Sequence, residues 1–319
     1  MTSGTKIKTI ATFLALTTAI ISGTNNFLAK IAATTLGSPI AYTTLKNSVV
    51  ALLLLGLIII CGRWREIARL NRRQKLILLA IGVIGGSIPF ALFFTGLTMT
   101  SALNAAFIHK TLFIWVAILA IPLLKEKISR WQWLGIIAIF AANLLLGGFR
   151  GFEFNLGELM ILGATILWAI ENIIAKKALA ELSMLTVVGA RLIIGSILLI
   201  SYLVLTKSLP NPATLSSVQW GWTLLTSLLL LGYVLTWYAA LKRAPATYVA
   251  TLLVPATLVT NALTAIFLTH TFTWLQSLSV ALFVVGLILM IRFALSAPAK
   301  LLTTEQTLNH SHGRTASLH

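Results

Sequence analysis

Long apolar runs separated by short polar segments fill most of the chain. An α-helix needs about 20 apolar residues to cross the hydrocarbon core of a bilayer, and the runs approach that length. Charged residues, Gly or Pro bound each run and mark its ends. The pattern therefore predicts an all-α membrane protein with ten transmembrane helices, at 10–29, 40–61, 76–97, 103–124, 132–149, 157–178, 185–206, 220–241, 246–268 and 273–292.

The composition supports this interpretation and removes several classes of function. Of the 319 residues, 58% are hydrophobic and only 10% are charged. A soluble domain carries about 25% charged residues, so this chain has too few to cover a surface in water. The chain has no Asp and no GxxxxGK(S/T) loop, which argues against aspartyl-phosphate pumps and against an ATP-driven pump in one chain. Its single cysteine, Cys61, cannot form an intrachain disulfide.

The positive charges are unevenly divided between the two sides that the ten helices define. The formal net charge of +17 would suggest a nucleic acid partner in a soluble chain, but here it indicates membrane topology. Eighteen of the 24 Lys and Arg residues fall on the side of the N terminus, three on the opposite side and three inside predicted helices. Basic loops remain in the cytoplasm. We therefore expect a protein of the cytoplasmic (inner) membrane, with both termini in the cytoplasm and no nucleic acid partner.

The two halves of the chain resemble each other. Asn26 in the first predicted helix matches Asn172 in the sixth, and the identities around the fourth helix recur 144 residues later (Ala102, Ala106 and Gln132 with Ala246, Ala250 and Gln276). Five helices per half is an odd number, so the second half must be inverted relative to the first. We expect two inverted five-helix repeats, 10–149 and 157–292, and a disordered cytoplasmic tail at 296–319. Inverted repeats are common in secondary transporters, with the substrate between the halves.

At this point the sequence resembles the EamA family of the drug/metabolite transporter (DMT) superfamily. The resemblance covers roughly 10–147 and 156–292. It rests on the layout of five plus five helices, on the TSALNAAFI stretch that ends at Ile108, and on LLKEKISRWQWLGI, which carries Glu126, Gln132 and Gly135. It implies secondary transport, often export, of amino acids or other small metabolites.

The second half departs from the pattern of that family. His270 stands where the Glu would be, and Ser279 where the Gly would be. In the first half Thr111 replaces a common proline, which Pro255 retains in the second half. Glu126 itself lies among basic residues, where it forms either a latch between the halves or a solvated loop charge.

Four ionisable residues lie inside predicted helices, where a charge costs at least about 2.5 kcal/mol at mid-bilayer. The helical rise places Lys46 and Lys110 about 10 Å in from the outer side, and Glu171 and Arg191 about 10 Å in from the cytoplasmic side. Glu171 and Arg191 can meet as an ion pair. Lysines facing a cavity suit a carboxylate, and Glu171 suits an ammonium group, so a zwitterionic amino acid fits. The alternative is a structural Glu171–Arg191 pair, with lysines that snorkel to the interface.

Further candidate residues surround these charges. An imidazole can carry a proton near neutral pH, so His109 is, with Glu171, a candidate for proton coupling. Trp115 and Trp168 suit apolar walls of a site, although ordinary helix packing is the more common role. Gly82 and Gly86 form a GxxxG spacing that favours close helix packing. The predicted substrate-binding set is Lys46, Lys110, Glu171, Arg191, Asn26, Asn172, Trp115 and Trp168.

The sequence as a whole predicts a secondary transporter that exports small metabolites by alternating access. Its expected partners are a small-molecule substrate and membrane lipid. No cofactor, no metal ion and no enzymatic activity are expected. A channel or non-transporting scaffold, or an intramembrane enzyme, is the alternative. Saturable flux that is stimulated by counter-substrate separates a carrier from a channel.

Overall fold

The computed structural model describes residues 3–36, 38–147, 151–271 and 273–296, so the predicted tail lies almost entirely outside the described residues. All regular elements within these ranges are helical. In chain order they are α1 (Ser3–Leu36), α2 (Pro39–Ile60), α3 (Trp64–Ala68), α4 (Arg72–Gly86), α5 (Ile88–Leu97), α6 (Ala102–Lys110), α7 (Leu112–Leu124), α8 (Arg130–Gly147), α9 (Leu156–Glu181), α10 (Met184–Leu205), η1 (Pro212–Thr214), α11 (Ser217–Arg243), α12 (Ala246–Leu253), α13 (Ala256–Thr264), η2 (Ala265–Thr269) and α14 (Trp274–Ser296).

These helices reproduce the predicted order of spans. Nine helices or consecutive helical segments of the described chain are long and apolar enough to cross a membrane. Three of the nine are built from shorter pieces: α4 with α5, α6 with α7, and α12 with α13 and η2. The remaining predicted span, 132–149, coincides with the shorter apolar helix α8, and residues 148–150 lie outside the described ranges. The predicted all-α membrane fold is confirmed.

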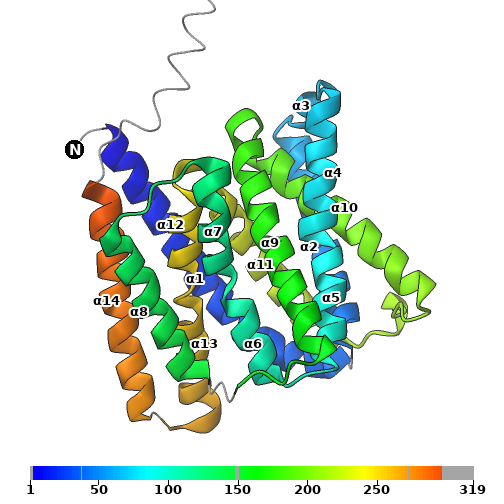
Figure 1. Ribbon diagram of the computed structural model, residues 1–319. Helices are drawn as coiled ribbons and strands as arrows, with labels where there is room; N and C mark the ends of the chain where they lie inside the picture. Colours follow the sequence, from blue (N-terminus) through cyan, green and yellow to red (C-terminus); the bar gives the residue numbers. More distant parts are fainter. Residues whose placement is uncertain (1–2, 37, 148–150, 272, 297–319) are drawn as a thin grey trace, which may run out of the picture.

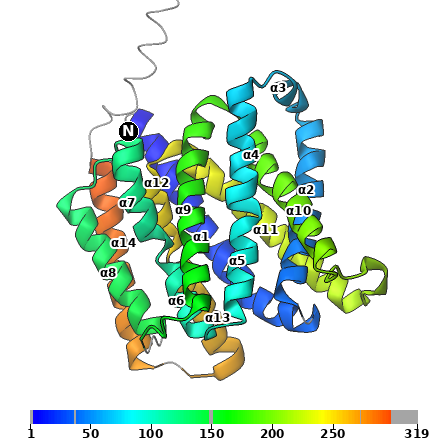
Figure 2. The same ribbon diagram turned by 45° about the vertical axis from the view of Figure 1, so that its right-hand side comes forward.

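The helices pack in a pattern that repeats when the two halves are exchanged. The first helix of the first half, α1, packs along α11, and its counterpart α9 packs along α4 and α5. Figure 2 shows α9 beside the column formed by α4 and α5. The last helices of the halves, α8 and α14, pack along each other at one edge of the molecule (Figure 1). Each half therefore uses its first helix to contact the third span of the other half.

Side-chain hydrogen bonds at helix starts follow the same repeat. At the start of α8 the Ser129 backbone N–H donates to Gln132 Oε1 at 2.9 Å, and the Gln132 N–H donates to Ser129 Oγ. Thr273 and Gln276, 144 residues later, make the same reciprocal pair at the start of α14. Such a pair satisfies N–H groups that the first helical turn leaves free. The sequence identity between Gln132 and Gln276 thus marks one structural device used twice.

A second pair of contacts joins the first helix of one half to the fourth span. Asn104 in α6 donates to Glu158 in α9 at 2.6 Å, and Tyr248 in α12 shares a hydrogen bond of 2.7 Å with Thr12 in α1. Residue 248 follows 104 by 144 positions, and residue 158 follows 12 by 146. The two contacts are therefore equivalent when the halves are exchanged, and each joins one half to the other, although the residue types differ.

The fourth span of each half is broken at the same place. α6 ends at Lys110 and α7 begins at Leu112, while α12 ends at Leu253 and α13 begins at Ala256. The breaks contain Thr111 and Pro255, which are 144 residues apart. Proline has no N–H to donate and clashes with the preceding turn, so it interrupts a helix. Thr111 interrupts α6 without proline, and its hydroxyl donates to the Ile108 carbonyl at 2.6 Å.

Glycines allow α4 to approach α10 closely. A Cβ at Gly82 would overlap the Ile194 side chain, and a Cβ at Gly86 would overlap the α10 backbone at Arg191 and Gly195. Gly195 in turn faces the Gly86 backbone. Small residues on facing helices permit such backbone contact in lipid. The GxxxG of α4 therefore serves helix packing, as its spacing predicts.

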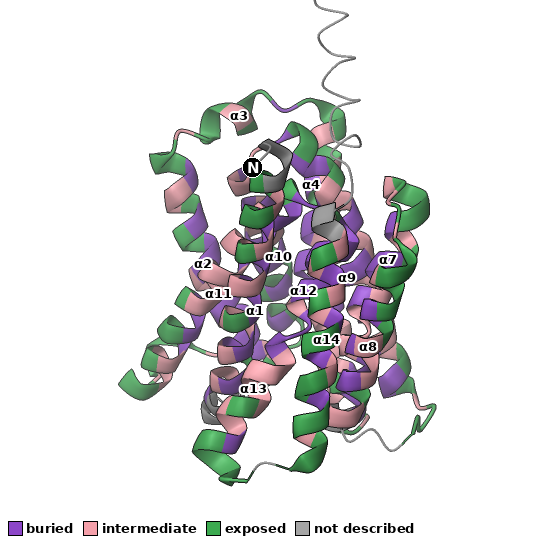
Figure 3. Ribbon diagram, turned by 90° about the vertical axis from the view of Figure 1, so that its left-hand side faces the viewer, coloured by how far each residue is buried: buried purple, intermediate pink, exposed green. Residues whose placement is uncertain are grey.

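Apolar side chains cover much of the outer surface. Leu52 on α2 is 69% exposed, and Ile137 on α8 and Ile197 on α10 are each 58% exposed. Figure 3 shows buried residues on the inward faces of the helices and exposed residues on their outer faces and at both ends. Apolar surface of this extent suits contact with lipid tails rather than water. The chain is accordingly a multi-pass membrane protein.

Candidate functional site

A completely buried carboxylate lies in the middle of α9. Glu171 is 0% exposed. The hydroxyl of Tyr238, on α11, donates to Glu171 Oε1 at 2.5 Å. The second oxygen, Oε2, is buried and has no hydrogen-bond partner in the described chain. A buried polar atom without a partner costs about 1–3 kcal/mol, so this oxygen has unused capacity to accept a hydrogen bond.

Arg191, on α10, reaches the same cluster without pairing directly with Glu171. Its Nη1 donates to the Tyr238 hydroxyl at 3.3 Å, and its Nε donates to the Gly85 carbonyl at 3.4 Å. No direct salt bridge joins Arg191 to Glu171 in the described chain. The Tyr238 hydroxyl lies between the two charges and hydrogen-bonds to both. The structure thus brings the predicted partners together, but through a tyrosine and not by an ion pair.

Gly85, near the end of α4, connects this cluster to the first half of the chain. Its carbonyl accepts hydrogen bonds from Trp168 Nε1 at 3.1 Å and from Arg191 Nε. A Cβ at this position would overlap the Glu171 side chain and lie 3.3 Å from Arg191 Nε. Only glycine therefore leaves room for the buried acid beside α4.

The His109 ring packs against aromatic rings, one of which lies on the same helix as Glu171. Trp168, one helical turn before Glu171, is buried, and its ring centre lies 4.9 Å from that of His109 in an edge-to-face arrangement. Phe93 lies 5.3 Å from His109 and 5.8 Å from Trp168. His109 Nδ1 is buried and has no hydrogen-bond partner among the described residues. Trp168 of the second half therefore contacts His109 of the first half, three residues before Glu171 on α9.

Lys110 is the last residue of α6, at the break in the fourth span. It is partly buried and makes no hydrogen bond or salt bridge within the described chain. After the break, Trp115 Nε1 donates to the Thr111 hydroxyl at 3.1 Å and its ring packs on the apolar core. Transporters commonly bind substrate at such interrupted helices. Lys110 therefore has the setting of a binding residue, whereas Trp115 mainly supports the break.

Lys46, on α2, lies in a separate polar environment. Its Nζ lies 5.4 Å from the centre of the Tyr42 ring and has no acidic partner in the described chain. Tyr42 shares a 2.5 Å hydrogen bond with Thr226 on α11, and the Ser227 hydroxyl donates to the Lys46 carbonyl at 3.3 Å. No hydrogen bond or ion pair joins the Lys46 side chain to the other predicted site residues in the described structure.

The two predicted asparagines differ in their positions. Asn172, beside Glu171, is buried, and its Nδ2 donates to the Trp168 carbonyl at 2.9 Å. Its Oδ1 has no partner within the described ranges, so it is a second unused acceptor. Asn26 is exposed on α1, whereas its neighbour Asn25 is 8% exposed and carries a buried Oδ1 without a partner. By burial, Asn25 fits an internal site better than Asn26.

The sequence reasoning missed Tyr238 and Gly85, and it chose Asn26 rather than its neighbour Asn25 for the site. Tyr238 lies in an apolar run, yet a buried tyrosine hydroxyl needs a polar partner, which was a usable signal. Gly85 lies between Gly82 and Gly86, and the GxxxG spacing of those two glycines drew attention to helix packing instead of to Gly85. Within the described residues no group of three His, Cys, Asp or Glu side chains is placed to share a metal ion.

Glu126 joins the halves at the end of the molecule that carries α3, the turn before α8 and the turn before α12. We call this the basic end; it lies at the top of Figure 1. Glu126 Oε1 accepts from the Ala246 backbone N–H at 2.5 Å, and Oε2 accepts from the Thr247 N–H at 3.1 Å. A carboxylate at a helix start satisfies free N–H groups and the positive end of the helix dipole. Glu126 is therefore a latch between the halves, although its partner is a helix start and not a salt bridge.

The start of α12 needs a cap from elsewhere because Pro245, the residue before it, provides none. Pro245 precedes α12 and makes no side-chain cap, whereas Ser101, 144 residues earlier, caps α6 by accepting from the Asn104 N–H at 3.1 Å. Lys176 completes the turn by donating to the carbonyls of Leu241 and Ala244 at 2.6 and 2.8 Å. α6 is thus capped within its own half, and α12 by the other half.

Comparison with known proteins places this arrangement in a family. Residues 9–148 and 155–292 match the EamA-like transporter family. An "Uncharacterized transporter YyaM" of Bacillus subtilis (strain 168) is 28% identical over 177 residues, which cover 54% of this chain and 56% of that protein. An "Uncharacterized transporter" of Methanothermobacter thermautotrophicus is 27% identical over 145 residues, which cover 43% and 42% of the two chains. The alignments span about half the length of these relatives.

A solved structure described as "Crystal structure of protein" superposes with a TM-score of 0.76 over 90% of this chain and 99% of that chain. The two are 15% identical, so this likeness concerns the fold alone. The family matches, by contrast, cover both halves of the sequence. The chain therefore belongs to the EamA-like transporter family.

Proposed function

We propose that this transporter exports small metabolites such as amino acids across the cytoplasmic membrane by alternating access. The observation that carries the proposal is the half-satisfied carboxylate of Glu171. Tyr238 binds one of its oxygens, and the other is buried without a partner in the described chain. A ligand that donates a hydrogen bond to this oxygen is favoured, because the folded protein already bears the free-energy cost of burying the oxygen without a partner.

The chemistry around Glu171 supports a substrate with an ammonium group. The unused Oε2 of Glu171 and the unused Oδ1 of Asn172 are both acceptors and come from adjacent residues of α9. An ammonium group has three donors and bears the charge that complements a carboxylate. Lys110, a cation without an acidic partner at the break of α6, then suits the carboxylate of a zwitterion. We assign Lys46, which also has no acidic partner in the described chain, to the substrate pathway as a second cation apart from this cluster.

Glu171 and His109 are the candidates for proton coupling. Each has a buried atom that lacks a hydrogen-bond partner within the described ranges, and Trp168, three residues before Glu171 on α9, packs edge-to-face on His109. Protonation of Glu171 removes the charge that attracts an ammonium group. A proton and a substrate that compete for the same carboxylate are coupled in opposite directions, as antiport requires.

The latch at Glu126 supports alternating access and suggests which side is closed. It joins the first half to the start of α12 in the second half at the basic end. Basic loops face the cytoplasm, so we assign the basic end and both termini to that side. In this assignment the described conformation is closed to the cytoplasm, and release of the Glu126 latch accompanies opening.

The test is transport by the purified protein in liposomes. A panel of amino acids and organic acids is offered with and without a pH gradient, and the accumulated compounds are measured by mass spectrometry. We expect accumulation of at least one panel member, lost in Glu171→Gln and Lys110→Ala and kept in Lys177→Ala, which removes an exposed lysine of the same helix as Glu171. Stimulation by counter-substrate separates a carrier from a channel. Folded protein that accumulates no panel member removes amino acids as the substrate class.

A further inference from the structure

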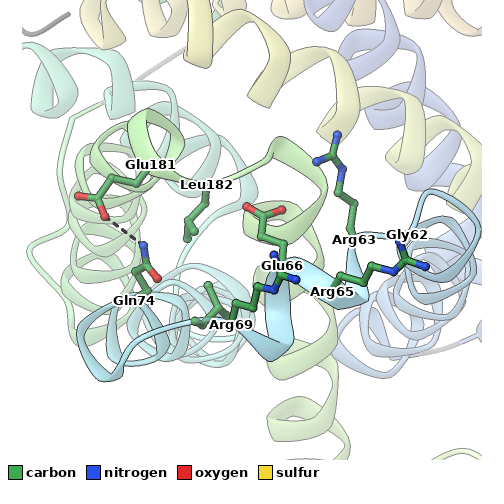
Figure 4. Close-up of a pocket in the computed structure, with 9 residues that line it drawn as sticks. Gly62, Arg63, Arg65, Glu66, Arg69, Gln74, Glu181 and Leu182 are labelled. Carbon is green, nitrogen blue, oxygen red and sulfur yellow. Dashed lines mark hydrogen bonds between the residues drawn. The ribbon is translucent and has the colours of Figure 1, made fainter. Parts of the chain in front are cut away.

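A pocket outside the proposed transport site lies at the basic end. It has a volume of about 410 Å³ and lies between the turn after α2, including α3, and the junction of α9 with α10. Figure 4 shows the arginine side chains on one side of the pocket with Glu66, and Gln74 with Glu181 on the other. Its charged lining residues are Arg63, Arg65, Arg69, Glu66 and Glu181.

Both acidic residues of the pocket already have partners. Glu66 accepts from the Ser183 backbone N–H at 2.8 Å and from the Thr186 hydroxyl at 2.9 Å, so it caps the start of α10. Glu181 accepts from Gln74 Nε2 at 3.3 Å and forms a 3.6 Å ion pair with Arg73. Neither carboxylate forms a salt bridge with the three lining arginines in the described chain, although the charge of Arg63 acts on Glu66.

The lining arginines are exposed and retain free hydrogen-bond donors. Arg63, Arg65 and Arg69 form no salt bridge and donate no side-chain hydrogen bond within the described chain. Arg65 lies over the Trp64 ring at 5.4 Å, which fixes its direction but leaves its N–H groups available. A guanidinium presents a planar fork of donors that matches two phosphate oxygens. The pocket is therefore lined by three guanidinium groups, each of which can bind two phosphate oxygens.

The position of the pocket relative to the membrane favours a lipid over a soluble anion. α2 is an apolar span that ends at Ile60, which is 81% exposed, and Trp64 follows at 52% exposed. Exposed tryptophan next to the end of a span marks the level of the headgroups. Six basic residues and one acidic residue lie between positions 63 and 75. Basic clusters directly beside a span attract anionic lipids.

We propose that this pocket binds the phosphate of an anionic phospholipid headgroup in the leaflet at the basic end. The headgroup lies between Arg63 and Arg69, and the acyl chains extend along the exposed apolar end of α2. The lining includes Glu66 from the first half and Leu182 from the second half. A bound lipid therefore contacts both halves on the side that Glu126 latches.

The experiment compares two double variants of the full-length protein in detergent. Arg63→Gln with Arg69→Gln removes two charges that line the pocket. Arg72→Gln with Lys75→Gln removes two charges from the same segment that do not line it. Binding of phosphatidylglycerol and phosphatidylcholine is measured by native mass spectrometry and by the shift of the apparent Tm. We expect about tenfold weaker phosphatidylglycerol binding in the pocket variant only, because it loses charge-assisted hydrogen bonds.

A variant that keeps the charge and a soluble competitor complete the experiment. Arg63→Lys with Arg69→Lys keeps the charge and loses the planar forks, so we expect an intermediate loss in a protein that still folds. Inorganic phosphate is added as a competitor. If both glutamine variants bind phosphatidylglycerol equally weakly, net charge alone explains the binding, and the proposal of a specific lipid site in the pocket is overturned. Binding of phosphate as tight as that of phosphatidylglycerol, or no preference over phosphatidylcholine, overturns the assignment to a lipid.

Discussion

The carboxylate of Glu126 caps the helix that begins at Ala246, and the two residues belong to different halves of the chain. This contact replaces the cap that Pro245 cannot provide. A side-chain cap contributes about 0.5–2 kcal/mol to stability.

Removal of this cap tests the latch. In Glu126→Ala we expect the apparent free energy of unfolding to fall by about 0.5–2 kcal/mol and the basic end to become more accessible. The measurements are thermal unfolding in detergent and hydrogen exchange at residues 244–250. Glu153→Ala is the control, because that glutamate is exposed and its side chain accepts a hydrogen bond only from nearby Asn155 in the described chain. Unchanged exchange in the Glu126 variant would falsify the latch.

Tyr238→Phe isolates the hydroxyl that links Glu171 to Arg191. The change leaves a buried carboxylate and a guanidinium without a shared partner, so we expect a loss of about 1–3 kcal/mol and impaired transport. Tyr202→Phe is the matched control, because Tyr202 is exposed on α10. If the two variants unfold at the same temperature and transport equally well, the hydroxyl has no role in the site.

Gly85→Ala tests the space beside Glu171. Its Cβ would overlap the Glu171 side chain, so we expect a loss of about 1–3 kcal/mol and reduced transport. Gly163, on α9, has no atom within 4 Å of the position that a Cβ would take. Gly163→Ala should therefore be neutral or stabilising by up to about 1 kcal/mol. Both variants are compared by thermal unfolding. Equal stability of the two contradicts the packing at Gly85.

The cap that Glu66 provides should depend on pH. Partial burial opposes its ionisation, but hydrogen bonds from Ser183 and Thr186 and the charge of Arg63 outweigh burial and lower the pKa of Glu66. A lowered pKa in the folded state gives stability that is present above the unfolded value of about 4.3 and is lost as pH falls through the folded value. Glu66→Gln should therefore lower the Tm at neutral pH, and the difference from the original protein should shrink below about pH 4. A difference that stays constant across this range contradicts ionisation as its source.

Cys61 provides a test of orientation without mutation. It is the single cysteine of the chain and is exposed at the end of α2, beside the basic end. A membrane-impermeant maleimide should label it in inside-out vesicles and not in intact cells. The reverse result places the basic end outside the cytoplasm and inverts the proposed direction of the latch.

The arrangement of helices was largely predictable because lipid forces each span to be a long apolar run. The repeat was also readable, since Gln132 and Gln276 keep the same capping role. The site was predictable only in part. Buried charge identified Glu171 and Arg191, but the chain spacing cannot show that Tyr238 lies between them. Asn26 matched Asn172 in sequence, yet the rotation of α1 exposes Asn26 and buries Asn25. Such details depend on helix rotation, which apolar periodicity does not determine in lipid.

The self-capped start of α6 and the partner-capped start of α12 also make the two ends of the transporter energetically unequal. Separation of the halves at the basic end breaks the hydrogen bonds to Glu126 and leaves α12 without a cap, whereas separation at α6 breaks the Asn104–Glu158 contact but leaves the Ser101 cap in place. An inverted repeat with identical halves would have two access states of equal energy. Here we expect the empty carrier to rest with its basic end shut, so that an arriving ligand or proton must supply the energy of every opening.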